Sequence, residues 1–297
     1  MAATTATATP GLRTRQLLAD YFDLTKPKVQ SLLLLTTVTT MEVAGSPSVS
    51  RVAVTCLGGY LSAGGAGAVN HYWDRDIDAR MKRTANRPVP SGRVSPGAAL
   101  RFGIALATLS FILMTATVGV LAASLALGGF VGYVGVYTMW LKRRTPHNIV
   151  IGGAAGAMPP LVGWAATRGS LSWTAVYLFA IVFYWTPAHF WALSLLMKDE
   201  YAEVGVPMLP VVRGEGETRR QILLYSLLLY AVSQLPFCAG AFGGVYLVGS
   251  MVLGLAFVGG AVALYRRADR RTALRLYLFS MLYLALLFGT MVADAKL

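Results

Sequence analysis

Three oxygen-bearing side chains recur at intervals of four residues in the segment NHYWDRDID: Asn70, Asp74 and Asp78. On a continuous helix this spacing holds them within about 80° of one another, whereas Asp76 lies on the far side. Carboxylates stacked in this way repel one another unless a cation lies between them. Hard oxygen ligands favour Mg²⁺, which commonly shares its shell with phosphate groups. The spacing therefore indicates a cation site; the alternative is a solvated acidic helix end balanced by arginines.

A second acidic group, Asp199, Glu200 and Glu203, lies in the segment KDEYAE. Each acidic group follows an apolar run, and the corresponding positions hint at an old duplication of four spans plus four. Two acidic helix ends that meet across a bundle can hold two Mg²⁺ ions, which is what a diphosphate needs to be bound and to depart. The basic residues nearby are suited to bind such an anion directly.

The elements that must position these groups are membrane helices, because hydrophobic residues make up 56% of the 297 and charged residues only 13%. We predict an all-α polytopic membrane protein, a bundle of about nine transmembrane helices, in which Pro159 and Pro160 interrupt the fifth. The expected spans are Val29–Gly45, Val52–Tyr72, Phe102–Val118, Leu121–Leu141, Ile149–Ala166, Trp173–Leu196, Ile222–Gly240, Val245–Tyr265 and Leu276–Val292. We expect a flexible N-terminal tail at 1–20 and a single transmembrane domain at 21–297, with no soluble linker between spans.

Of the 26 Lys and Arg residues, all but Arg51, Arg168 and Lys296 fall before the first span or in alternate loops. The positive-inside rule then places the N-terminus and both acidic groups in the cytoplasm and the C-terminus outside. It also accounts for most of the net charge of +13 with anionic lipid as the neighbour, so we expect no nucleic-acid partner. We expect a bacterial plasma membrane, with the inner membrane of a mitochondrion or plastid as the alternative.

Four long segments carry a resemblance to a known family. They are DYFDLTKPKV at Asp20–Val29, NHYWDRDIDARMKRTANRPVPSGRVSP at Asn70–Pro96, YTMWLKRRTPHNIVIGGAAGAMPPLVGW at Tyr137–Trp164 and WTPAHFWALSLLMKDEYAEVGVPMLPVV at Trp185–Val212. The acid spacing is similar to that of the UbiA-type intramembrane prenyltransferases. The NIVIGG and WTPAHFWAL stretches resemble the haem O synthase branch of that superfamily, the protohaem IX farnesyltransferases.

This resemblance implies transfer of a farnesyl group from farnesyl diphosphate to a vinyl carbon of haem b, with addition of water, using Mg²⁺. Haem A synthase or an assembly factor of a terminal oxidase is the implied protein partner. The alternatives are a related prenyltransferase acting on a quinone precursor or chlorophyllide, and a transporter, although a transporter would be expected to place its acids near the bilayer midplane.

The resemblance also implies roles for residues in the matching segments. Asn70, Asp74 and Asp78 would bind the first Mg²⁺, and Asp199 and Glu203 the second. The superfamily more often has aspartate at the positions of Glu200 and Glu203, so Glu200 is a further candidate ligand. Asp74, Asp78 and Lys142 are the expected catalytic residues. The expected diphosphate-binding residues are Lys26, Arg83, Arg87, Tyr137, Lys142 and Arg143.

Haem is a planar apolar macrocycle, so we expect aromatic walls at its site: Trp164, Trp185 and Trp191, with ordinary helix packing as the alternative for each. His189 is an ionisable residue inside a predicted span, which makes it a functional candidate facing the porphyrin carboxylates or the iron. The alternative for His189 is a hydrogen bond within the bundle.

Overall fold

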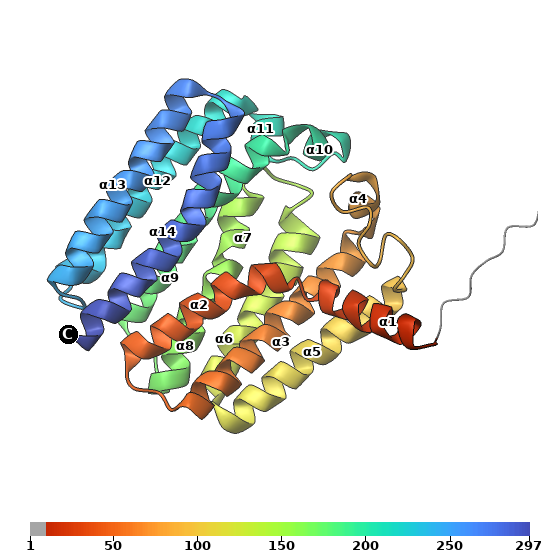
Figure 1. The fold of residues 1–297 in the computed structure, drawn as a ribbon, viewed down its shortest axis with the longest axis horizontal. Coiled ribbons are helices and arrows are strands. Elements are labelled where there is room, and N and C mark those ends of the chain that lie inside the picture. Colours follow the sequence, from red (N-terminus) through yellow and green to blue (C-terminus); the bar gives the residue numbers. More distant parts are fainter. Residues whose placement is uncertain (1–9) are drawn as a thin grey trace, which may run out of the picture.

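The computed structural model describes residues 10–297, and within this range the chain is helical and has no strands; the loop 81–95 is the longest connection between its helices (Figure 1). The helices in chain order are α1 (Pro10–Leu24), α2 (Pro27–Ala44), α3 (Val49–Trp73), α4 (Arg75–Arg80), α5 (Pro96–Thr117), α6 (Val120–Val131), the π-helix η1 (Gly132–Leu141), α7 (Asn148–Gly156), α8 (Met158–Arg168), α9 (Trp173–Leu196), α10 (Lys198–Glu203), α11 (Leu209–Val212), α12 (Gly214–Cys238), α13 (Gly244–Arg267) and α14 (Arg270–Lys296).

The prediction of an all-α membrane bundle is confirmed. Each expected span coincides with a helix or a helix pair, since α6 with η1 forms one and α7 with α8 forms another. Eight of these segments in the described range are long and apolar enough to cross a membrane. The ninth, α2, is not among them, and its buried face carries the polar residues Gln30, Thr36, Thr37 and Thr40.

The expected break in the fifth span lies at Ala157, between α7 and α8. Pro159 and Pro160 begin α8, where their missing N–H groups would have had no partner within the helix. The two prolines therefore lie where they remove no hydrogen bond from the helix.

Glycine lets α3 and α5 pack backbone to backbone. A Cβ on Gly65 would lie 2.6 Å from the carbonyl oxygen of Gly103, and a Cβ on Gly103 would lie 2.7 Å from that of Gly65. In membranes, where apolar burial does not drive helix association, such close contact between backbones is a main source of cohesion. The contact fixes α3, the helix that leads into the first acidic group.

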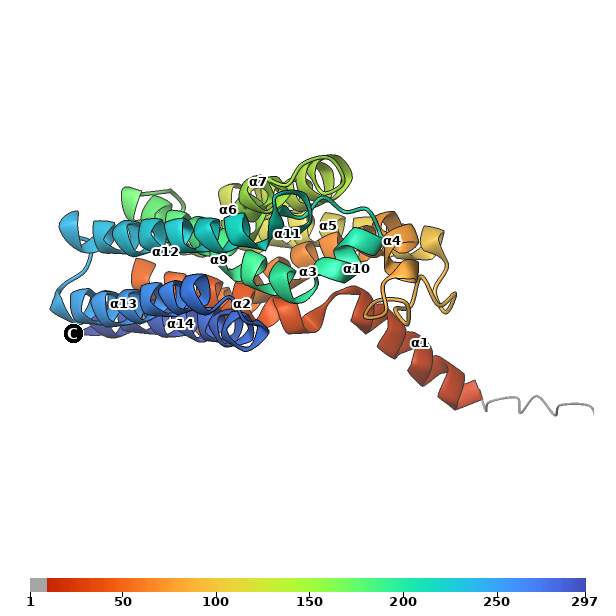
Figure 2. The same cartoon turned by 90° about the horizontal axis from the view of Figure 1, so that it is seen from above.

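The largest apolar core surrounds α9, which packs against α7, α12 and α14. Its largest fully buried side chains include Trp191, Tyr246, Phe257, Tyr283 and Phe288. In Figure 2, α12 and α9 lie on one side of α13 and α14, so the second half of the chain forms a layered block beside the helices of the first half.

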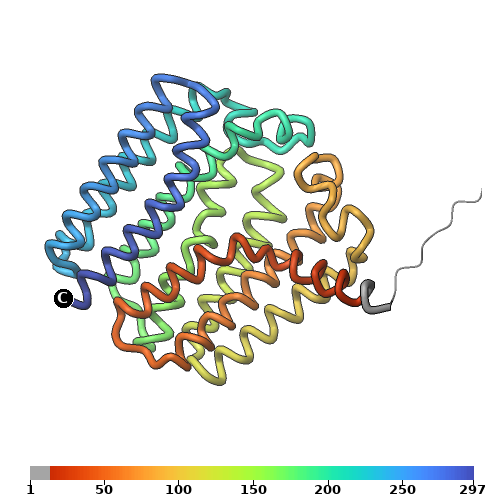
Figure 3. Tube along the Cα trace, in the orientation of Figure 1, coloured from red at the N-terminus to blue at the C-terminus, as the bar shows by residue number. Residues whose placement is uncertain are grey.

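The short helices α4 and α10, which carry the acidic groups, lie at the same end of the bundle as α1 (Figures 1 and 2). The C-terminus lies at the opposite end, as the trace in Figure 3 shows. Residues 1–9 of the expected tail lie outside the described residues. Residues 10–20 belong to α1, where the buried Asp20 accepts a hydrogen bond of 2.9 Å from Nε of Arg93.

Candidate active site

The junction between α3 and α4 keeps the first acidic group on one face. The backbone N–H of Asp74 donates to the carbonyl of Asn70 (2.9 Å), and that of Asp78 donates to the carbonyl of Asp74 (2.8 Å). These two bonds span the junction, although Asp74, with φ −89° and ψ 9°, ends α3 and precedes α4. Asn70, Asp74 and Asp78 are 3%, 1% and 4% exposed, whereas the Asp76 side chain is 55% exposed. The shared face expected from the spacing is present, and it points into the protein.

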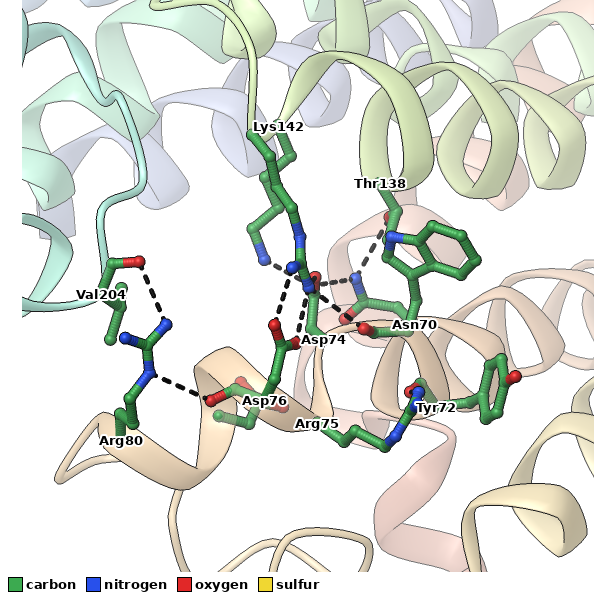
Figure 4. Close-up of polar contacts among 12 residues, drawn as sticks. Asn70, Tyr72, Asp74, Arg75, Asp76, Arg80, Thr138, Lys142 and Val204 are labelled. Carbon is green, nitrogen blue, oxygen red and sulfur yellow. Dashed lines mark hydrogen bonds and ion pairs between the residues drawn. The ribbon is translucent and has the colours of Figure 1, made fainter.

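Asp74 is at the centre of a polar cluster (Figure 4). Its Oδ2 accepts hydrogen bonds from Nδ2 of Asn70 at 2.7 Å and from Nζ of Lys142 at 2.5 Å, and its Oδ1 lies 3.5 Å from Nη2 of Arg143. Asn70 Nδ2 also donates to Oγ1 of Thr138 at 3.1 Å. A buried carboxylate needs such compensation, because charge removed from water is costly unless it is paired.

Lys142 reaches Asp74 because of the π-helix η1 that precedes it. The last turn of η1 is closed by the N–H of Lys142 donating to the carbonyl of Tyr137, five residues back. π-Helical turns are rare and are frequent at functional sites. Here the wide turn brings Thr138 and Lys142 to the same face, toward α3.

Lys26 approaches from a third element, the turn between α1 and α2. Its φ of 54° lies in the left-handed region, which a non-glycine residue seldom adopts. Its Nζ donates to Oδ1 of Asn70 at 2.5 Å. Burial, together with repulsion from Arg87 and Lys142, lowers the pKa of Lys26 to about 7, although Asp78 and Asp74 oppose the shift.

Arginines complete the basic side of the cluster. Arg87 Nη1 donates to Oδ2 of Asp78 at 2.7 Å. Arg143 forms hydrogen bonds of 2.8 and 2.7 Å with the exposed Asp76, and this pairing lowers the pKa of Asp76 to about 2. Arg83 is exposed on the same loop as Arg87.

Tyr137 belongs to η1 and packs over Gly152 of α7, where a Cβ would lie 2.4 Å from its ring. Its ring centroid is 5.5 Å from that of Tyr133. The structure therefore gathers Lys26, Arg87 and Lys142 around the acids, with Tyr137 in the same π-helical segment.

The three residues of the second acidic group face different surroundings. Asp199 lines a charged groove of about 220 Å³ whose other members include Lys198, Glu215, Arg219, Asp269 and Arg270. Glu203 is exposed. Glu200 is half-buried, and its Oε2 is buried without a hydrogen-bond partner among the described residues.

The two acidic segments are neighbours. Arg80, at the end of α4, donates to the carbonyl of Val204, directly after α10, at 3.4 Å, as Figure 4 shows. Within residues 10–297, however, no three Asp, Glu, His or Cys side chains converge as a metal-ligand set. The metal-binding roles remain predictions.

The expected haem residues divide between two faces of α9. Trp185 stacks on His189 with ring centroids 4.3 Å apart, and His189 stacks on Tyr277 of α14 at 4.9 Å. Trp191 is 2% exposed and packs edge-on against Tyr225 of α12. Trp164 of α8 packs, partly buried, against the same core.

Ser280 of α14 organises the Trp185 and His189 pair. Trp185 Nε1 donates to the Ser280 carbonyl at 2.8 Å, and His189 Nδ1 lies 2.6 Å from Ser280 Oγ. That hydroxyl already donates its proton to the carbonyl of Tyr277 (2.6 Å), so it accepts the Nδ1 proton of His189. The lone pair of the imidazole is therefore on Nε2.

Comparison with known sequences decides the family. The sequence profile of the UbiA prenyltransferase family matches residues 32–286. The chain belongs to this family. The UbiA fold agrees as well: a solved structure of digeranylgeranylglyceryl phosphate synthase superposes with a TM-score of 0.78 at 19% identity, covering 95% of this chain and 100% of that one. A UbiA homologue from Archaeoglobus fulgidus, bound to GPP and Mg²⁺, superposes with a TM-score of 0.70 at 15% identity, covering 92% and 99%.

Among UbiA-family relatives, a protein named protoheme IX farnesyltransferase from Chloroflexus aurantiacus is 56% identical over 97% of this chain. The chain spans 50% of that protein, and about half the length of several curated relatives it matches. A protein of the same name from Symbiobacterium thermophilum is 52% identical, and the match covers 97% of this chain and 98% of that protein.

Sequence reasoning missed several residues of this UbiA-family site. Thr138 and Ser280 lie inside apolar spans with no motif of their own, and only tertiary packing brings them to Asn70 and His189. Arg80 gave no signal beyond being one of several basic residues in its loop. Thr138 could have been noted because it lies four residues before Lys142, within the segment YTMWLKRR.

Proposed function

We propose that this chain transfers the farnesyl group of farnesyl diphosphate to a vinyl group of haem b, with addition of water, to give haem O and diphosphate. The observation that carries the proposal is the buried Asn70–Asp74–Asp78 face, with Lys26, Lys142 and Arg87 bonded directly to it. A site with acidic and basic side chains so close together suits a polyanion held through divalent cations. The full-length match to the Symbiobacterium thermophilum farnesyltransferase supports the choice of substrates.

The residues present fit Mg²⁺. The donors at the first position are two carboxylates and an amide oxygen, the hard ligands that this ion prefers. At the second position, the buried and unpartnered Oε2 of Glu200 has the character of a ligand oxygen awaiting a cation. We therefore assign Asn70, Asp74 and Asp78 to one ion and Glu200 to the other, in preference to Asp199 and Glu203. When bound, Mg²⁺ would supply positive charge that stabilises the departing diphosphate.

The basic residues would also stabilise the negative charge of the departing diphosphate. Lys142, Lys26 and Arg87 come from three different segments, and each is held by a partner within residues 70–78, so their charges are oriented before the substrate binds. Fixed charges of this kind stabilise a developing anion without the cost of reorganisation. The bond between the farnesyl C1 and the diphosphate oxygen then breaks, and both electrons leave with the oxygen.

The π electrons of the haem vinyl group form the new carbon–carbon bond to C1. Water adds its hydroxyl to the neighbouring carbon and loses a proton. Location inside the bundle keeps other water away from the allylic cation until the carbon bond has formed. With Nδ1 of His189 donating to Ser280, the lone pair on Nε2 would be available to the haem iron, whereas a bond to a porphyrin carboxylate would require a proton on Nε2.

We further propose that the protein lies in the bacterial plasma membrane with its N-terminus in the cytoplasm. The support is the charge distribution, since the basic loops lie at the end of the bundle that carries α4 and α10. Haem A synthase or a terminal oxidase assembly factor would take up the product.

The test is mass analysis of reactions in proteoliposomes that contain the purified chain, Mg²⁺ and farnesyl diphosphate, with haem b, an aromatic acid or chlorophyllide as acceptor. We expect a product only with haem b, with the mass of haem b plus one farnesyl group and one hydroxyl group. Asp74→Asn serves as the inactive control. Prenylation of another acceptor, or diphosphate release with no haem product, would refute the assignment.

A further inference from the structure

His71 is a buried residue of the first acidic segment that the mechanism above does not use. It lies in the last turn of α3, directly after Asn70, and is 2% exposed. Neither ring nitrogen has a hydrogen-bond partner within the described residues. Buried polar atoms are nearly always paired, so an unpaired imidazole calls for an explanation, such as a ligand that completes its bonding.

His71 points toward the basic side of the cluster. Four residues earlier on the same face, a Cβ on Gly67 would lie 2.9 Å from the Leu24 carbonyl oxygen and 3.5 Å from Cγ of Lys26. Lys26 and Arg87 are both within electrostatic range of the ring.

These neighbours decide what kind of group His71 meets. Two cations beside the ring disfavour a metal ion at this point and favour an anion. An imidazole carries at least one N–H in either protonation state, so it can always donate to an anionic oxygen.

We propose that His71 donates a ring N–H to the diphosphate of the prenyl donor, and so is a further substrate-binding residue. This inference rests on the proposed function, because it takes the diphosphate to be the anion that binds here. It explains why a ring with no protein partner is kept inside the cluster: its partner arrives with the substrate.

The test compares His71→Leu, which keeps the bulk and removes the donor, with His71→Gln, which keeps an N–H. The exposed His147→Leu is the matched control. Titration calorimetry measures binding of inorganic diphosphate in the presence of Mg²⁺. We expect His71→Leu to weaken binding roughly 10- to 100-fold, and His71→Gln and His147→Leu to stay within a few-fold of the wild type.

A second measurement separates binding from folding. Replacing an unpaired buried polar group by an apolar one of similar shape should leave ligand-free thermal stability unchanged or raised. Equal diphosphate affinities in the Leu and Gln variants would overturn the proposal. So would a Leu variant that unfolds at lower temperature while binding diphosphate normally, since that is the behaviour of a structural residue.

The outcome is independent of the acceptor. If the wild type binds diphosphate with Mg²⁺ but forms no haem product, the proposed acceptor is wrong and His71 can still be assigned. If the wild type does not bind diphosphate at all, both the proposed function and the role of His71 are refuted.

Discussion

The ion pair between Asp74 and Lys142 makes a quantitative prediction about the ligand-free protein. We expect Asp74→Asn and Lys142→Gln to be coupled, because Oδ2 of Asp74 and Nζ of Lys142 are 2.5 Å apart with side chains only 1% and 13% exposed. Breaking a buried pair from one side costs about 3–5 kcal/mol, because the remaining charge is left without compensation.

Two other contacts moderate that figure for Lys142→Gln. Asp74 would keep its hydrogen bond from Asn70 and the longer contact to Arg143. We therefore expect about 2 kcal/mol for Lys142→Gln, about 3 kcal/mol for Asp74→Asn, and about 3 kcal/mol for the double variant, because the second change removes a charge that the first left unpaired. The coupling energy is then about 2 kcal/mol.

The assay is denaturant unfolding in detergent micelles, followed by tryptophan fluorescence, with EDTA present to exclude metal. The exposed pair of Lys198 and Glu215, 3.1 Å apart, provides a control cycle that should couple by less than about 0.5 kcal/mol. A coupling for Asp74 and Lys142 as small as that of the control would refute the arrangement described here.

Three further outcomes are expected. Glu200→Gln should lower the rate of diphosphate release at least 100-fold through loss of a ligand oxygen, whereas the rate for Asp199→Asn should stay within a few-fold of the wild type. Equal losses in the two variants would contradict our choice of Glu200 over Asp199. Gly103→Ala should lower the unfolding free energy by about 1–3 kcal/mol because its Cβ would meet the Gly65 carbonyl, while Gly289→Ala, which has open space around it, should change it little in the same denaturant titration. In EDTA, Lys26→Met should be most favourable to stability below pH 7 and lose that advantage as the pH rises toward 10. The reason is that a lysine whose pKa is lowered by folding costs stability as long as the unfolded chain still binds its proton. Thermal unfolding of both proteins across this pH range checks the sign, and a difference in stability that does not change with pH would contradict it.

The sequence predicted those parts of the site that depend on local periodicity. Asn70, Asp74 and Asp78 share a face because four-residue spacing survives the α3–α4 junction. The same argument did not bring Asp199 and Glu203 together with the first group. Met197, with φ −122° and ψ 18°, breaks the helix before α10, so the orientation of that short helix is not inherited from α9.

Other features needed tertiary structure. The contact of Lys26 with Asn70 depends on a left-handed residue at a turn, and that of Thr138 depends on a π-helical register, neither of which composition or spacing reveals. By contrast, the sequence alone could have predicted that Trp185 and Trp191 lie on different faces of α9. Six residues correspond to about 240° around a helix, so the two rings could not have faced one haem from the same side of α9.

The register of η1 makes the length of the segment Gly132–Leu141 matter more than most of its residue types. An insertion or deletion there that kept the present hydrogen-bond pattern would turn every later side chain around the helix axis. The ammonium of Lys142 would then face away from Asp74, and the loop into α7 would have to absorb the change in length. We therefore expect this segment to tolerate many apolar replacements and few insertions or deletions, the reverse of what is usual for a surface loop.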